Sequence, residues 1–108
     1  MRDNFFDGKL PISPSNHKKL KIIHLEMNKF TGVLPTDMRF LESLEELWLY
    51  DNLLSSYMPT GIGELTNLNS FSLSYNDIRG NMPTDMVKLK KLKHVSTNIL
   101  IVIYALKR

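Results

Sequence analysis

Apolar residues recur along the chain in blocks of the form LxxLxLxxN, in which other apolar residues can replace leucine. The blocks begin at Leu20, Leu44 and Leu68. The last two apolar positions of each block are separated by a single residue, and this period of two is typical of a β-strand. We therefore predict short parallel strands at residues 22–26, 46–50 and 70–74, one in each block.

A second pattern shows that these blocks belong to a repeat. An octet that starts with asparagine and ends with proline recurs at Asn4, Asn28, Asn52 and Asn76, with a constant spacing of 24 residues. A fixed period of this length with regularly spaced leucines indicates a leucine-rich solenoid. The leucines of one coil are expected to point inward and to stack on those of the next, because a single coil cannot bury its apolar face alone.

Each complete repeat carries a further apolar pair after its proline, with the two members three residues apart. The pairs are Met38 and Leu41, Ile62 and Leu65, and Met86 and Leu89. A spacing of three suits a 3₁₀ or short α-helix better than a strand. We expect the chain to return across the convex back of the solenoid as turns or short helices.

The asparagine is the polar exception in the repeat. An amide side chain has two donors and an acceptor, and it can pair with backbone groups that are left open where the strand ends. We predict that Asn28, Asn52 and Asn76 form a structural ladder rather than a set of ligand contacts.

Glycine recurs four residues after the asparagine, at Gly8, Gly32 and Gly80. Glycine permits a tight turn with positive φ. Ser56 takes this place in the third octet, so a positive φ cannot be obligatory there.

The pattern LxxLxLxxNxLxGxIPxxLxxL, most complete from Leu68 to Leu92, resembles the plant-type 24-residue leucine-rich repeat. This repeat occurs in receptor-like kinase ectodomains, receptor-like proteins and polygalacturonase-inhibiting proteins. The resemblance covers residues 4–96. It implies an α/β repeat fold, a right-handed solenoid with a concave parallel sheet. It also implies work at the cell surface or outside the cell, with the concave face binding a peptide, protein or glycan.

The 108 residues are 43% hydrophobic and 23% charged, which predicts one globular domain. We expect a half coil at 1–19, full coils at 20–43, 44–67 and 68–91, and a degenerate C-terminal coil at 92–108.

Family members usually close their ends with cysteine-bearing caps, whereas this chain has no cysteine. A piece of a longer solenoid, whose uncapped ends could self-associate, is therefore a serious alternative. Residues 99–106 are apolar and uncharged, and such a segment tends to pair with strands of other molecules.

Function is expected from the side chains that point outward from each strand. Neighbouring strands lie about 4.8 Å apart, so the repeat brings five outward residues into one patch: His24, Trp48, Tyr50, Asp51 and Tyr75. Exposed tryptophan and tyrosine often dominate binding energy. The patch predicts a ligand-binding surface. The alternative is that Trp48 only covers the sheet and that the coils serve as a structural spacer or as a non-functional fragment.

Other chemistries have little support in the sequence. His24, Glu26 and Glu46 lie near one another on the predicted sheet, but one imidazole and two carboxylates are common on any surface, so we predict no metal, no cofactor and no catalytic residue. A net charge of +3 does not favour nucleic acid. The lysines near residue 90 are read as a solvated flank. Residues 99–106 are too short to span a bilayer, which needs about 20 residues.

Overall fold

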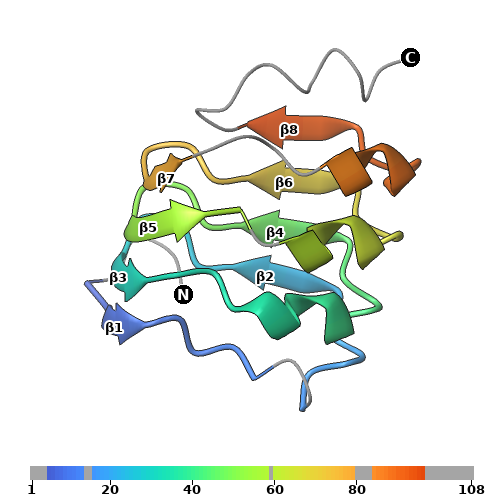
Figure 1. Ribbon diagram of the computed structural model, residues 1–108. Helices are drawn as coiled ribbons and strands as arrows, with labels where there is room; N and C mark the ends of the chain where they lie inside the picture. Colours follow the sequence, from blue (N-terminus) through green and yellow to red (C-terminus); the bar gives the residue numbers. More distant parts are fainter. Residues whose placement is uncertain (1–4, 14–15, 59, 80–83, 97–108) are drawn as a thin grey trace.

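The computed structural model describes residues 5–13, 16–58, 60–79 and 84–96, and the chain winds through it as a stack of coils (Figure 1). Four parallel strands form the first sheet, in the order β2-β4-β6-β8. Their bounds are Ile22–His24, Glu46–Trp48, Ser70–Ser72 and His94–Ser96. Each strand pairs with the residues 24 positions further on, as Ile23 does with Leu47. The predicted α/β repeat solenoid with short parallel strands is confirmed.

These strands are shorter than predicted, because each ends at its third residue rather than its fifth. The backbone contact with the next coil continues past the strand, since the Leu25 N–H donates to the Trp48 carbonyl at 2.9 Å. The chain then turns at Met27, Asp51 and Tyr75, whose φ angles are +59°, +58° and +58°. An extended strand cannot pass through the left-handed region, so no strand can continue beyond residues 26, 50 and 74.

A second parallel sheet, which the sequence analysis did not predict, runs along another side of the stack in the order β1-β3-β5-β7. Its strands are Asp7–Lys9, Lys29–Gly32, Leu53–Tyr57 and Asp77–Arg79. Here each residue pairs with the residue 22 positions further on, as Asp7 does with Lys29. Equivalent residues are therefore staggered by two positions per coil, about 7 Å along the strand.

Three 3₁₀ helices complete the coils: η1 (Thr36–Phe40), η2 (Thr60–Glu64) and η3 (Thr84–Lys88). Their apolar residues Met38, Ile62 and Met86 are fully buried. The prediction of short helical turns after each proline is thus confirmed, and the 3₁₀ form is the one that occurs.

The core is a continuous column of leucine, isoleucine, methionine and phenylalanine side chains between the two sheets and the 3₁₀ helices. Leu44 and Leu68 are fully buried, whereas Leu20, which holds the same repeat position one coil earlier, is 38% exposed. Leu10 and Ile12 pack against this end of the core and cover it only partly. Gly80 and the apolar run at 99–106 lie outside the described residues.

Candidate binding surface

The first sheet has one face toward the core and one face away from it, and we call the second the open face. Ile23, Leu47 and Phe71 point into the core, because alternate residues of a strand point to opposite sides. His24 and Trp48 are only half-buried and lie on the open face. This is the face that the sequence predicts to be concave and to bind ligand.

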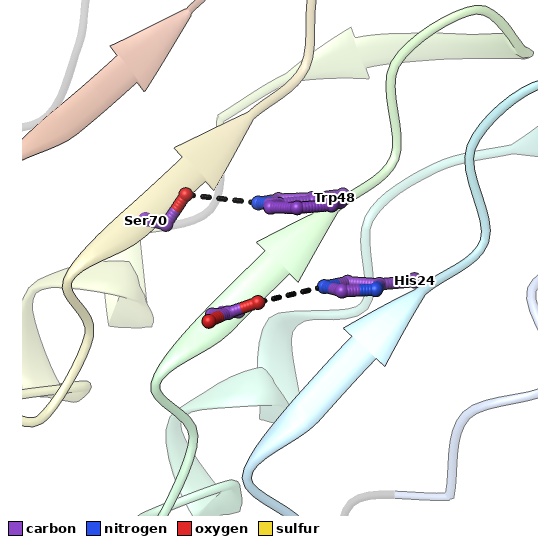
Figure 2. A network of polar contacts seen from close by, with 4 residues as sticks. His24, Trp48 and Ser70 are labelled. Atoms are coloured by element: carbon purple, nitrogen blue, oxygen red, sulfur yellow. Dashed lines mark hydrogen bonds and ion pairs between the residues drawn. The ribbon is translucent and has the colours of Figure 1, made fainter.

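His24 and Trp48 form an aromatic stack across strands β2 and β4 (Figure 2). Their ring centroids are 3.8 Å apart and their planes differ by 5°. Strand register explains the contact, since His24 pairs directly with Trp48 in the parallel ladder. The two rings therefore support one another and present a rigid edge on the open face.

Both rings also bond to the next strand. The His24 Nε2 atom lies 2.8 Å from Glu46 Oε1, and these two side chains are 30% and 32% exposed. Trp48 Nε1 donates a hydrogen bond of 2.8 Å to Ser70 Oγ on β6 (Figure 2). Each bond joins residues 22 positions apart, so the same cross-strand arrangement occurs twice in succession.

The other three patch residues lie further along the coil. Tyr50 is half-buried, just past the end of β4. Asp51 and Tyr75 occupy the turns with positive φ, where Tyr75 is 77% exposed. Among the described residues, the one ring contact inside the predicted patch joins His24 to Trp48.

Glu26 corrects one sequence expectation. It was placed beside His24 among the outward residues, but its side chain is fully buried. The equivalent residues of the next two coils, Tyr50 and Ser74, are half-buried. The residue stands directly before the turn at Met27, where the chain bends inward and the alternation of the strand no longer holds. The expectation that Glu26 lies beside His24 on the outward side of the sheet is therefore wrong.

The repeat asparagines lie where the first sheet turns toward the second. Asn52 Nδ2 donates to the carbonyl of Leu49 at 3.1 Å in its own coil and to that of Leu25 at 3.0 Å in the preceding coil. Its Oδ1 accepts the Phe30 N–H at 3.1 Å. Asn76 makes the corresponding bonds one coil later, including 2.8 Å to the Leu49 carbonyl.

Two further findings concern sites and membranes. The described residues contain no group of three or more histidine, cysteine, aspartate or glutamate side chains placed to hold a metal ion. Within the same residues, no helix is long and apolar enough to span a bilayer.

Comparison with known proteins identifies the family. The family model for the Leucine Rich Repeat matches residues 43–65, which span β4, β5 and η2. The chain folds as a leucine-rich repeat solenoid. A comparison with curated protein sequences finds no match.

Solved structures similar to this leucine-rich repeat protein are plant receptor ectodomains. The ectodomain of the membrane receptor kinase GASSHO1/SCHENGEN3 from Arabidopsis thaliana, in complex with CASPARIAN STRIP INTEGRITY FACTOR 2, is 32% identical, with a TM-score of 0.82 over 92% of the chain. The plant peptide hormone receptor RGFR1, in complex with RGF2, is 32% identical, with a TM-score of 0.82 over 89%. The BIR2 ectodomain from Arabidopsis thaliana is 30% identical, with a TM-score of 0.84 over 89%.

The chain spans only part of each of these structures. It covers 12% of the GASSHO1/SCHENGEN3 ectodomain, 16% of RGFR1 and 50% of BIR2. The similarity therefore concerns the repeat scaffold over a few coils.

Proposed function

We propose that this leucine-rich repeat protein is a non-catalytic recognition module that binds a peptide or protein segment on its open face. The observation that carries the proposal is the rigid His24–Trp48 stack on that face. Two of the similar receptors were solved in complex with a partner, RGFR1 with RGF2 and GASSHO1/SCHENGEN3 with CASPARIAN STRIP INTEGRITY FACTOR 2. By the same likeness, the module works at the cell surface or outside the cell, as part of a receptor-like protein.

Aromatic side chains held in place suit this role. A ring that is already packed loses little conformational freedom when a ligand covers it, so more of the contact energy remains for affinity. Trp48 is fixed by the His24 ring on one side and by the Ser70 hydroxyl at its nitrogen. Tyr50, Asp51 and Tyr75 extend the proposed surface toward the turns.

A second candidate is a structural spacer, and one observation favours it. One nitrogen of each ring already has a partner within the chain, because His24 Nε2 contacts Glu46 and Trp48 Nε1 donates to Ser70. In a spacer these bonds would serve to hold neighbouring coils together, and the open face would meet only solvent.

Peptide selection on the intact chain separates the two candidates. A library of random linear peptides is selected on the immobilised protein, and the dissociation constants of the enriched peptides are measured by titration calorimetry. For recognition through the open face, Trp48→Ala and Tyr50→Ala should each weaken binding by about 2 kcal/mol, or roughly thirtyfold. Lys90→Ala is the control, because Lys90 is an exposed charge on the flank, where substitutions mainly alter the association rate.

Unchanged affinity in the Trp48→Ala and Tyr50→Ala double variant would contradict the proposal. Circular dichroism confirms that the variants are folded, since both substitutions leave the inward leucines and the asparagines in place. Failure to enrich any peptide, together with a loss of stability in the Trp48→Ala variant, would support the spacer.

A further inference from the structure

Across the open face, two aromatic rings are followed by a serine in the same row. In the ladder of the first sheet, His24 pairs with Trp48, and Trp48 pairs with Ser72. The His24 ring covers one face of the indole. Because β4 lies between β2 and β6, the other face of the indole is turned toward β6 (Figure 2). A serine side chain is too short to cover this face, and among the described residues no second ring stacks on Trp48.

Strand β6 presents a polar surface beside this indole face. Ser70 and Ser72 are its residues on the open side, and Ser74 follows just past the end of the strand; all three are half-buried. We call these three residues the serine surface. Neighbouring strands are about 4.8 Å apart, and the two stacked rings are 3.8 Å apart. A flat ring laid on the indole would therefore lie directly above Ser72.

The hydrogen bonds of the row show where such a ring would find a partner. Each of the two rings bonds to the residue 22 positions further on, as Trp48 Nε1 does with Ser70 Oγ at 2.8 Å. The same step from Ser72 leads to His94, which is exposed on β8 and pairs with Ser70 in the ladder. A neutral imidazole has one nitrogen that accepts a hydrogen bond. A ring above Ser72 with an N–H on its edge would thus meet an acceptor at His94.

The charge on the β8 side of the serine surface is positive. The backbone N–H groups of Lys93 and His94 both donate to the Asn69 carbonyl, at 2.8 Å and 3.1 Å, which holds these residues against the start of β6. Lys93 is exposed and belongs to no ion pair among the described residues. A carboxylate next to a ring on the serine surface would be attracted to this charge.

We propose that the serine surface holds a tryptophan side chain of the bound peptide, so that the partner's indole becomes the third ring of the row. This inference rests on the proposed recognition on the open face and names the residue that the face selects. The partner's indole stacks on Trp48, its N–H donates to His94, and an acidic residue next to it lies near Lys93. An indole combines a large ring face with a ring N–H, which phenylalanine, tyrosine and leucine lack.

The test uses the full chain and a short synthetic peptide, Gly-Ser-Trp-Glu-Glu-Gly with blocked ends. The chain contains a single tryptophan, so NMR of the isotope-labelled protein shows one indole N–H signal, that of Trp48. Addition of the unlabelled peptide at millimolar concentration should move this signal and the Ser72 amide signal until they saturate. A peptide with leucine in place of tryptophan should bind at least about tenfold more weakly. Lysines in place of the glutamates should weaken binding about threefold at low salt.

The Ser72→Trp variant fills the same place with a ring of the chain itself. The new ring can stack on Trp48 as Trp48 stacks on His24, so the variant should bind the tryptophan peptide at least about tenfold more weakly. Ser55→Trp is the matched control, because Ser55 is exposed on strand β5 of the second sheet, and its dissociation constant should be unchanged. Circular dichroism shows whether the variants are folded, and backbone amide signals report their binding.

The His94→Ala variant tests the hydrogen bond and does not depend on the folding of Ser72→Trp. It is compared on the tryptophan peptide and on a peptide with phenylalanine in its place. Loss of the acceptor should weaken binding of the tryptophan peptide about fivefold more than that of the phenylalanine peptide, because phenylalanine donates no hydrogen bond. Equal effects on the two peptides would overturn the assignment of His94 as the acceptor.

Equal binding of the tryptophan and leucine peptides, or an unchanged dissociation constant in folded Ser72→Trp, would overturn the inference. If Trp48→Ala still abolished binding in that case, recognition on the open face would stand and only the tryptophan assignment would fail. An indole signal that moves with none of the peptides would also overturn the inference. The selection from the random library would then decide separately whether the open face binds a peptide.

Discussion

Asn52 shows how one side chain joins two coils and two sheets. It is 5% exposed and bonds to the backbone at Leu25 and Leu49, just past strands β2 and β4 of the first sheet, and at Phe30 in the second. These are the backbone groups that a turning chain leaves open in an apolar interior, where an unpaired polar group is costly. The asparagine is thus the polar link between stacked coils.

We predict that Asn52→Ala lowers the free energy of unfolding by about 1 to 3 kcal/mol, because the buried Phe30 N–H loses its partner and the Leu25 and Leu49 carbonyls each lose one of two asparagine donors. Urea denaturation measures the change. Asn67→Ala is the matched control: Asn67 Nδ2 also donates to a carbonyl of the preceding coil, at 3.1 Å from Glu42, but this bond is exposed. Water can replace it, so the control should change stability by less than about 0.5 kcal/mol. Equal effects of the two substitutions would show that burial of Asn52 is unimportant.

At the scale of elements, the 3₁₀ helix η2 is set apart by its glycines. A methyl group at position 63 would lie 2.6 Å from the carbonyl oxygen of Asp85 in η3. The other coils carry Arg39 and Val87 at this position, and both are exposed. Gly63 is instead buried, and its lack of a side chain allows η3 to pack directly against η2.

We predict that Gly63→Ala destabilises the protein by about 1 to 3 kcal/mol, since the backbone of η3 must move to admit the methyl group. Thermal unfolding followed by circular dichroism measures the loss. Glu64→Ala is the control in the same helix: Glu64 is exposed, and such substitutions change stability by less than about 0.5 kcal/mol. A stability of Gly63→Ala equal to that of the control would mean that η2 and η3 are not packed this closely.

The described part of the molecule is a one-dimensional stack, in which strands and 3₁₀ helices lie against the corresponding elements of adjacent coils. Stability in such a stack is a sum of coil and interface contributions, so it depends on position along the axis. Leu44 in a central coil is fully buried, whereas Leu20 at the same repeat position in the first coil is 38% exposed. The two leucines differ in their place in the stack rather than in their type.

We therefore predict that Leu44→Ala costs about 2 to 5 kcal/mol of unfolding free energy, as expected for a buried leucine, and that Leu20→Ala costs less than half as much. Urea denaturation of the two variants provides the comparison, each acting as the other's control. Similar losses at the two positions would show that Leu20 is covered in solution, by a partner or by a part of the chain outside the described residues.

The sequence by itself determined the repeat, the first sheet and the helical turns. Leu20, Leu44 and Leu68 recur at an invariant interval, and only a stack of coils buries such a row continuously. The spacing of apolar residues was sufficient to predict the strands and helical turns, because a period of two or three residues is a direct property of strand or 3₁₀ geometry. The proximity of His24 and Trp48 also followed from the repeat, since a 24-residue period aligns these positions.

Only the tertiary structure decided the second sheet, the burial of Glu26 and the direction of the aromatic contacts. Strands of three to five residues around Phe30, Leu54 and Ile78 are too short to give a clear alternation, and their 22-residue register differs from the repeat period. Glu26 is buried, whereas Tyr50 and Ser74, which precede the same turn in the next two coils, are half-buried, and the left-handed conformation of a methionine has no signal in the sequence. These features depend on how one coil lies against the next, which residue spacing along the chain does not encode.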